Sequence, residues 1–246
     1  MNKFAIVGDS HAVYFTQLNK LTNLSKSYYA PSDYKVADIS AATIRGFGNR
    51  NSTLKVSDQI NKLIEDTNPS TLIFCLGQVD IELGYYYRSI IKEKNVDNFI
   101  EEIINIYKNY LLNLQQEKKV NIVIKGINPT VLINQIFAIN YIGNITTENF
   151  ETPEERKFYK QKVEDELPDY SFRFSLSANF NNALKDVADH FNWPYFDIWD
   201  DVIDPKTGNL YLKYLPAWFD HHLVDSVEVR QIHYNALYKV MRHFIP

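Results

Sequence analysis

Three short segments carry the residue types needed for nucleophilic catalysis on an acyl group. Gly8-Asp9-Ser10 follows an apolar run near the N-terminus, Gly77-Gln78-Val79-Asp80 follows a second apolar run, and Asp220-His221-His222-Leu223 lies near the C-terminus. A serine hydroxyl is a weak nucleophile until a base removes its proton. Histidine can act as that base because an unperturbed imidazole titrates near pH 6.5, and a carboxylate on the other ring nitrogen fixes its tautomer. The order of serine early and histidine late is therefore compatible with acyl transfer.

Ser10 has two interpretations. It follows the apolar run 4–7, which indicates a buried strand, and open α/β sheets place their ligand crevice where strands end. The segment 12–20 also has a helical pattern, so Ser10 could instead cap a helix. Because similar turns follow two later strands, we favour the nucleophile. Asp9 is expected to hold the turn by accepting backbone N–H groups, and His11 either to support the site or to be exposed.

Apolar runs alternate with amphipathic segments along the whole chain. This alternation predicts an α/β fold in which helices cover both faces of a mostly parallel sheet of about five strands, a three-layer α/β/α sandwich. No linker or repeat divides the chain, so we expect residues 1–246 to form one domain. Strands are predicted at 4–7, 35–39, 71–76, 120–124 and 193–199, and helices at 53–67, 96–116, from 152 to Pro168, 174–191 and 226–243.

Three loops follow the first three predicted strands and should meet at one edge of the sheet. They contain Gly8-Asp9-Ser10, Ser40-Ala41-Ala42 and Gly77-Gln78-Val79-Asp80. Backbone N–H groups and an amide side chain in such loops can stabilise a developing oxyanion.

The chain resembles the SGNH (GDSL-type) hydrolases in three sequence blocks that occur in the family's order. Gly8-Asp9-Ser10 matches the first block, Gly77-Gln78-Val79-Asp80 is similar to the third, and Asp220-His221-His222-Leu223 is similar to the last. The resemblance implies a flavodoxin-like α/β/α sandwich and a serine esterase. It implies that Ser10 is the nucleophile, His222 the base and Asp220 its acid. The implied oxyanion hole consists of the backbone N–H groups of Ser10 and Ala41 and the amide of Gln78.

The sequence departs from the family pattern at three positions. Gln78 replaces an asparagine, which moves the amide outward by one methylene. Ala41 stands where a glycine is expected, and it can serve if its φ is negative; Gly46 is the alternative. Asp220 lies two residues before His222 instead of three. Either the loop is kinked so that Asp220 reaches an imidazole, of His221 or of His222, or the site is a Ser–His pair.

Aromatic and cationic residues near these blocks are candidates for substrate binding. Tyr86, within Tyr85-Tyr86-Tyr87, could stack on a sugar ring or pack in the core. Arg45 and Arg88 could bind a substrate hydroxyl, carboxylate or phosphate, or form surface ion pairs. His221 could also contact substrate. The substrate expected from this setting and from the family is a small acyl ester, such as acetyl on a carbohydrate.

Composition limits the other classes of function. The chain of 246 residues has 26 basic and 30 acidic residues, which gives no electrostatic case for a nucleic-acid partner. The single cysteine, Cys75, excludes an internal disulfide, and no signal sequence or membrane span is recognised, so we expect a cytoplasmic protein. The uncharged stretch 126–147 should form a loop and a short helix over the sheet. No spacing of histidine and cysteine indicates a metal, and no cofactor is expected.

Two other functions use the same sequence features. A carbohydrate O-acyltransferase would carry the same catalytic residues, with a sugar hydroxyl in place of water. A non-catalytic glycan-binding domain would explain the shifted aspartate and the glutamine at position 78. Fold alone does not separate these alternatives.

Overall fold

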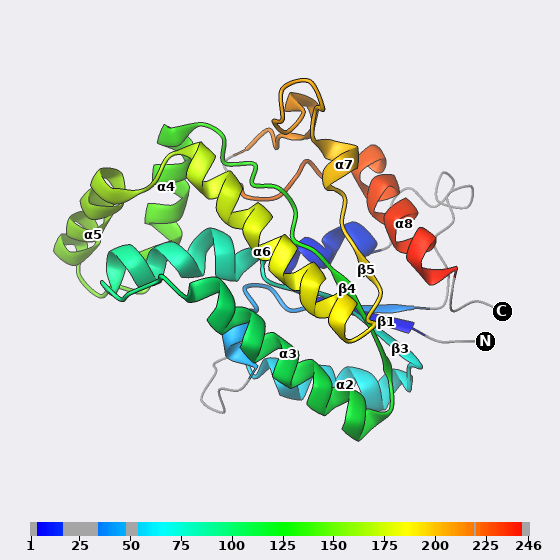
Figure 1. Cartoon of the computed structure of the whole chain (residues 1–246). Helices are drawn as coiled ribbons and strands as arrows, with labels where there is room; N and C mark the ends of the chain where they lie inside the picture. The colour runs from blue at the N-terminus through cyan, green and yellow to red at the C-terminus, as the bar shows by residue number, and fades with distance from the viewer. Residues whose placement is uncertain (1–3, 17–33, 48–53, 219, 243–246) are drawn as a thin grey trace.

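A five-stranded parallel sheet forms the centre of the computed structural model, which describes residues 4–16, 34–47, 54–218 and 220–242 (Figure 1). The strand order is β2-β1-β3-β4-β5, and each adjacent pair is parallel. The predicted α/β class and sheet are therefore confirmed. The strands are β1 (Phe4–Gly8), β2 (Lys35–Asp38), β3 (Thr71–Cys75), β4 (Asn121–Lys125) and β5 (Tyr195–Phe196).

The strand order reverses direction at β1. Ile6 pairs with Val36 of β2 on one side and with Ile73 of β3 on the other. The chain thus places β2 on one side of β1 and then adds β3, β4 and β5 in order on the other side. Such a switch point leaves a crevice at the carboxyl ends of its two central strands, which here are followed by Ser10 and Gln78.

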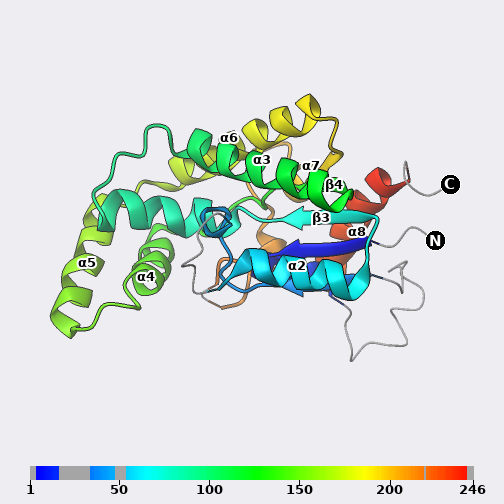
Figure 2. The ribbon, with the colours of Figure 1, turned by 90° about the horizontal axis from the view of Figure 1, so that it is seen from below.

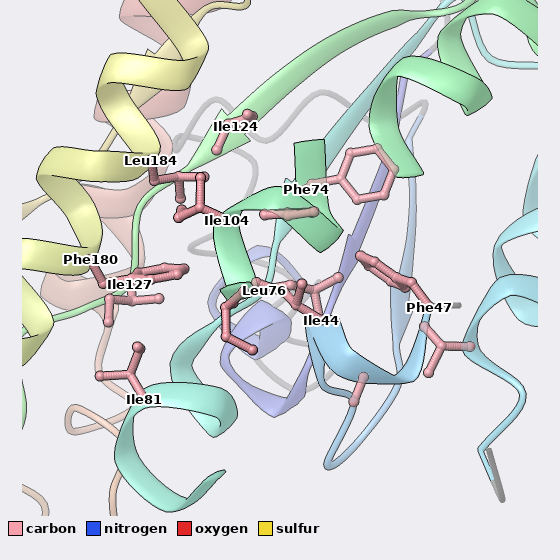
Figure 3. Close-up of a cluster of buried hydrophobic side chains, with 14 of the residues drawn as sticks. Ile44, Phe47, Phe74, Leu76, Ile81, Ile104, Ile124, Ile127, Phe180 and Leu184 are labelled. Atoms are coloured by element: carbon pink, nitrogen blue, oxygen red, sulfur yellow. The ribbon is translucent and has the colours of Figure 1, made fainter. Parts of the chain in front are cut away.

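Alternate side chains of the strands face two hydrophobic layers. Val7, Phe74 and Ile124 belong to one layer, which is covered by α2 (Val56–Thr67), α3 (Phe99–Lys118) and α6 (Tyr170–His190). Figure 3 shows Phe74 and Ile124 in this layer together with Ile104 of α3 and Phe180 and Leu184 of α6. The period-two alternation of the strands therefore gives three central strands, β1, β3 and β4, that are mostly buried on both faces of the sheet.

The opposite face of the sheet is covered by the two ends of the chain. Ile6 and Ile73 pack in a layer with Tyr14 and Phe15 of η1 (Ser10–Phe15) and with residues of α8 (Val227–Met241). Figure 2 shows α2 on one side of the sheet and α8 on the other. The helix α8 begins after Ser226, whose hydroxyl accepts the N–H of Val229. This layer holds the serine-bearing turn and the C-terminal part of the chain together.

The segment 126–147 forms the predicted loop and helix, but the helix does not cover the sheet as expected. The helix α4 (Gln135–Thr146) packs against α5 (Pro153–Glu166), and the two lie side by side beyond the carboxyl ends of the strands (Figures 1 and 2). The remaining elements are the short helices η2 (Ile44–Gly46), η3 (Asp80–Gly84), η4 (Tyr87–Ile91), α7 (Trp199–Val202) and η5 (Leu212–Tyr214). No helix in the described ranges is both long enough and apolar enough to cross a membrane.

Several element boundaries differ from the sequence predictions. A single 3₁₀ segment, η1, occupies the start of the predicted helix 12–20, whose later part falls outside the described residues. The helix α6 begins at Tyr170 instead of 174, because the carboxylate of Asp169 accepts the N–H of Phe172 and caps it. The segments η3 and η4 are π-helical turns that the sequence did not indicate. Their wider turns alter which side chains face the core.

Gly8 is required for space rather than for a turn. It is the last residue of β1, and a Cβ atom built on it would lie 2.7 Å from the carbonyl oxygen of Cys75 and 2.7 Å from the Cβ of Ala12. Glycine therefore allows the strand end and η1 to approach β3 closely. This close approach fixes the position of the next two residues, Asp9 and Ser10.

Candidate active site

Ser10, His222 and Asp220 form a chain of hydrogen bonds at the carboxyl end of β1. The Oγ atom of Ser10 lies 2.7 Å from Nε2 of His222, and Nδ1 of His222 lies 2.6 Å from Oδ1 of Asp220. Ser10 and His222 are partly buried, and Asp220 is more open. The structure thus brings together the nucleophile, base and acid that the sequence predicts, although they are separated by 212 positions.

Hydrogen bonds from two side chains, Tyr14 and Arg230, hold the segment around His222 over η1. The hydroxyl of Tyr14 donates to the carbonyl of Leu223 at 2.8 Å, in a buried position. The guanidinium of Arg230, on α8, donates to the carbonyl of Thr16 at 2.6 Å and to the carboxylate of Asp225. Both bonds join the first described segment to the last part of the chain, and they explain why the serine and the imidazole meet.

A tight local turn brings Asp220 within reach of His222. The Oδ1 atom of Asp220 accepts the backbone N–H of His221 at 2.6 Å and also contacts Nδ1 of His222. Aspartate commonly bonds to the following backbone in this way. The hydrogen bond from His222 outweighs the effect of burial and lowers the pKa of Asp220 to about 2. The spacing of two residues is therefore no obstacle to the Asp220–His222 contact.

Asp9 rather than Ser10 caps η1. Its Oδ1 accepts the backbone N–H of His11 at 2.9 Å, as expected for a residue that holds the turn, and contacts Nδ1 of His11 at 3.0 Å. Both side chains are buried. Burial would raise the pKa of Asp9, but the charge and hydrogen bonds of His11 lower it. Burial lowers the pKa of His11 despite the neighbouring carboxylate.

His222 is packed between two other imidazoles. The ring of His11 stacks on it with centroids 4.1 Å apart and planes at 19°, and the ring of His221 meets it edge-on at 4.5 Å and 86°. His11, expected to be supporting or exposed, is therefore a supporting residue. These contacts limit the orientations that the imidazole of His222 can adopt.

His221 is buried, which corrects the prediction that it contacts substrate. Its Nδ1 lies 3.0 Å from Oε2 of Glu82, and its ring packs on that of Tyr141 from α4 at 5.2 Å. Burial would lower the pKa of His221, but the hydrogen bond and charge of Glu82, with the charge of Asp220, raise it. Glu82 was not identified from the sequence.

Gln78 is buried and already bonded to a neighbouring loop. Its Nε2 donates to the carbonyl of Asn128 at 3.1 Å, and its Oε1 accepts the N–H of Asn128 at 2.7 Å. An amide nitrogen carries two hydrogens, so one is used here and one is left for the role that the sequence predicts. The contact with Asn128 fixes the plane of the amide, and Asn128 was not identified from the sequence.

Ala41 has a positive φ of 61°, which corrects the expectation of a negative value. It is exposed, and it lies in a turn closed by the N–H of Ala42 and the carbonyl of Ile39 at 2.9 Å. The left-handed conformation costs an alanine roughly 1–2 kcal/mol, whereas glycine adopts it freely. The conformation here is thus the one that a glycine at this position would favour.

The substitution Ala41→Gly is expected to stabilise the protein by about 0.5–1 kcal/mol. The gain comes from relief of the left-handed strain, and it is reduced by the greater freedom of glycine in the unfolded chain. Urea unfolding of parent and variant measures the difference. Gly208 is a matched control, since it also has a positive φ, of 69°, and a Cβ there would meet nothing within 4 Å. Gly208→Ala should therefore destabilise the protein, and a change of the same sign in both variants would contradict the prediction.

The structure also corrects one predicted substrate contact, Tyr86, and shows the ion-pair alternative for Arg45 and Arg88. Tyr86 is 2% exposed and belongs to the core, so it cannot stack on a sugar. Arg45 and Arg88 both pair with the carboxylate of Glu102 on α3, at 2.6 Å and 3.3 Å, and Arg45 also lies over the ring of Phe99. The two arginines therefore form a partly exposed ion-pair cluster between η2, η4 and α3.

The three imidazoles do not fit a metal ion. One ring nitrogen from each of His11, His221 and His222 lies within 4.8 Å of the others. Zinc requires lone pairs that converge on a point about 2.0–2.1 Å from each nitrogen. Because His11 and His222 are stacked nearly parallel, their in-plane lone pairs cannot converge, and Nε2 of His222 is bonded to Ser10. That the protein needs no cofactor stays a prediction.

Comparisons of the whole fold find structures of hydrolases. A structure from Bacteroides fragilis that is described as an acylhydrolase has a TM-score of 0.60 and 10% sequence identity, and the match covers 99% of this chain and 88% of that one. A GDSL-like lipase from Bacteroides thetaiotaomicron has a TM-score of 0.58 and 10% sequence identity, and the match covers 99% of this chain and 89% of that one. An acetylxylan esterase from Geobacillus stearothermophilus has a TM-score of 0.54 and 14% sequence identity, and the match covers 98% of this chain and 94% of that one.

Sequence comparison finds nothing of this kind: no protein-family model and no curated protein matches the chain. The likeness is therefore one of structure, over nearly the whole length of both partners. With a parallel 2-1-3-4-5 sheet and a serine turn at the end of β1, the chain has the fold of the SGNH/GDSL hydrolases.

Proposed function

We propose that the protein is a carboxylic-ester hydrolase in which Ser10 is the nucleophile, His222 the general base and acid, and Asp220 the carboxylate that orients His222. The observation that carries the proposal is the continuous chain of hydrogen bonds from Ser10 through His222 to Asp220. The fold and the names of the similar structures support the same reaction class.

The first half of the reaction transfers the acyl group to the enzyme. Nε2 of His222 takes the proton of Ser10 as Oγ attacks the carbonyl carbon, and the carbonyl oxygen becomes an oxyanion. The backbone N–H groups of Ser10 and Ala41 and the free N–H of the Gln78 amide are the proposed donors to it. The positive φ of Ala41 strains the residue but leaves its N–H in place, whereas the N–H of Gly46, the alternative donor, is bonded to the carbonyl of Thr43. When the intermediate collapses, the ester C–O bond breaks and His222 gives its proton to the departing alkoxide.

The second half releases the acid. His222 removes a proton from water, the hydroxide attacks the acyl carbon, and Ser10 leaves with the proton returned by His222. Asp220 stabilises the imidazolium in both halves. We propose acetyl esters of carbohydrates as the substrate, because acetylxylan esterases are among the similar structures. The acyltransferase alternative needs the same residues with a sugar hydroxyl in place of water.

Trapping of the acyl-enzyme tests the proposal. The full chain is mixed with p-nitrophenyl acetate, quenched in acid, and digested for mass spectrometry. We expect release of p-nitrophenol above the buffer rate and one acetyl group on the peptide that contains Ser10. Acetylation only of lysines, or no release above buffer, would overturn the proposal and favour a binding domain. Addition of a sugar acceptor then separates hydrolysis from transfer by the ratio of free acetate to acetylated sugar.

A further inference from the structure

Two buried carboxylate–imidazole pairs flank the proposed base. On one side Asp9 binds His11, whose ring stacks on His222, and on the other Glu82 binds His221, whose ring meets His222 edge-on. Asp9 is fully buried and Glu82 is 3% exposed. In the proposed mechanism Asp220 alone serves as the carboxylate partner of His222, so the second and third carboxylates need a separate explanation.

Glu82 is placed by an unusual piece of backbone. It lies in η3, a π-helical turn in which the N–H of Tyr85 donates to the carbonyl of Asp80. Such wide turns are rare, and they occur frequently at functional sites. The turn follows β3 within a few residues, so it starts at the same sheet edge as Gln78. The side chain of Glu82 is thereby directed inward to His221 rather than to solvent.

The pair formed by Glu82 and His221 is costly for folding. Within the described part of the chain, Oε1 of Glu82 is buried and has no hydrogen-bond partner. A buried polar atom without a partner destabilises a fold, and an apolar side chain of similar shape is often as good or better. Stability therefore does not account for a carboxylate at this position, whereas control of the neighbouring imidazole does.

We infer that Glu82 is a positioning residue, which holds His221 against His222 and thereby fixes both the orientation of the base toward Ser10 and the charge beside it. The inference rests on the proposed function and deepens it. Glu82 touches neither Ser10 nor the substrate in this scheme and acts only through His221. The conclusion follows from the hydrogen bond, the edge-on ring contact and the burial of Glu82 and His221.

The charge on His221 affects the protonation of His222. The groups that face His221 are Glu82 from η3, Asp9 and His11 from the start of the chain, Tyr141 from α4, and Asp220 and His222 from its own loop. An imidazolium on His221, held by Glu82, opposes a second proton on the adjoining His222. Loss of Glu82 would remove the support for the charge on His221, so the test follows the pH dependence of the reaction as well as its rate.

The test compares Glu82→Gln and Glu82→Leu with the parent and with Glu102→Gln, a variant of a partly exposed glutamate on α3 that pairs with Arg45 and Arg88 and whose described contacts include no imidazole. Kinetics of p-nitrophenyl acetate hydrolysis, thermal unfolding and an NMR titration of the imidazole of His222 are measured on the full chain. For Glu82→Gln we expect kcat/KM to fall about tenfold and its acid limb to shift in pH. Glu82→Leu should lose more activity with an unchanged or higher melting temperature. Glu102→Gln should resemble the parent.

The outcomes separate this inference from the proposed function. A parent-like acid limb and a parent-like His222 titration in Glu82→Gln would overturn the inference. Activity that falls only in step with the melting temperature in both variants would also overturn it, because that is the result of a purely structural role. If Ser10→Ala hydrolyses the ester as fast as the parent, the proposed function fails. The NMR titration still decides whether Glu82 controls His222.

Discussion

Ser10→Ala is expected to lower kcat/KM for p-nitrophenyl acetate by about 10³-fold or more. The substitution removes the atom that lies 2.7 Å from Nε2 of His222 and leaves the base and the oxyanion donors in place. The residual rate should come from those groups and from the unspecific reactivity of surface side chains. Steady-state kinetics with a buffer blank measure the effect.

A control for Ser10→Ala is available within the same chain. Ser175 is exposed on α6, in a position where alanine is a good helix former, so Ser175→Ala should keep the activity and stability of the parent. Melting curves of the two variants establish that both are folded. Equal hydrolysis by the parent and by folded Ser10→Ala would remove Ser10 from the mechanism.

Asp220→Asn is expected to lower kcat/KM by about 10²- to 10⁴-fold. The amide can still accept the backbone N–H of His221, so the turn should persist. The same oxygen faces Nδ1 of His222, and as a neutral amide oxygen it no longer supplies the negative charge that stabilises the imidazolium formed on His222. The result decides between a triad and a Ser–His pair, because a pair would lose less than about tenfold.

The pH profile gives a second check on Asp220. Its folded-state pKa is lowered to about 2 by the hydrogen bond from His222, whereas an unperturbed aspartate titrates near 3.9. A lowered pKa means that the charge and its contribution to the folded state are complete above about pH 4 and are lost as the pH falls through about 2. We therefore expect that, if the pH–rate profile of the parent has an acid limb above pH 4, the same limb appears at the same pH in Asp220→Glu. An acid limb that moves with the carboxylate would contradict this assignment.

The parts of the fold that depend on local pattern were predictable from the sequence. Apolar runs such as 71–76 are strands because both faces of the sheet are covered, and Thr152-Pro153 starts α5 because a capping hydroxyl and a proline favour helix initiation. Once the strands are recognised, the edge where Ser10 and Gln78 lie follows from parallel topology.

The parts of the site that depend on tertiary contacts were not predictable. Nothing in the residues around Glu82 signals a π-helical turn, since such a turn forms only when packing favours a wider ring of hydrogen bonds. Arg45 and Arg88 lie 43 positions apart, and their common partner Glu102 becomes visible only in three dimensions. The sign of φ at Ala41 likewise depends on the turn that closes over it.

The hydrogen bonds of Tyr14 and Arg230 between η1 and the C-terminal segment imply an order in which the site forms during synthesis. In the proposed mechanism, Ser10 is synthesised 212 positions before His222, the base that activates it. A nascent chain that has completed β1 to β5 therefore holds an unreactive alcohol, and it gains its reactivity only when Leu223 reaches the hydroxyl of Tyr14 and α8 docks on Thr16. In the proposed mechanism, a chain that ends before His222 therefore carries Ser10 without the group that would activate it.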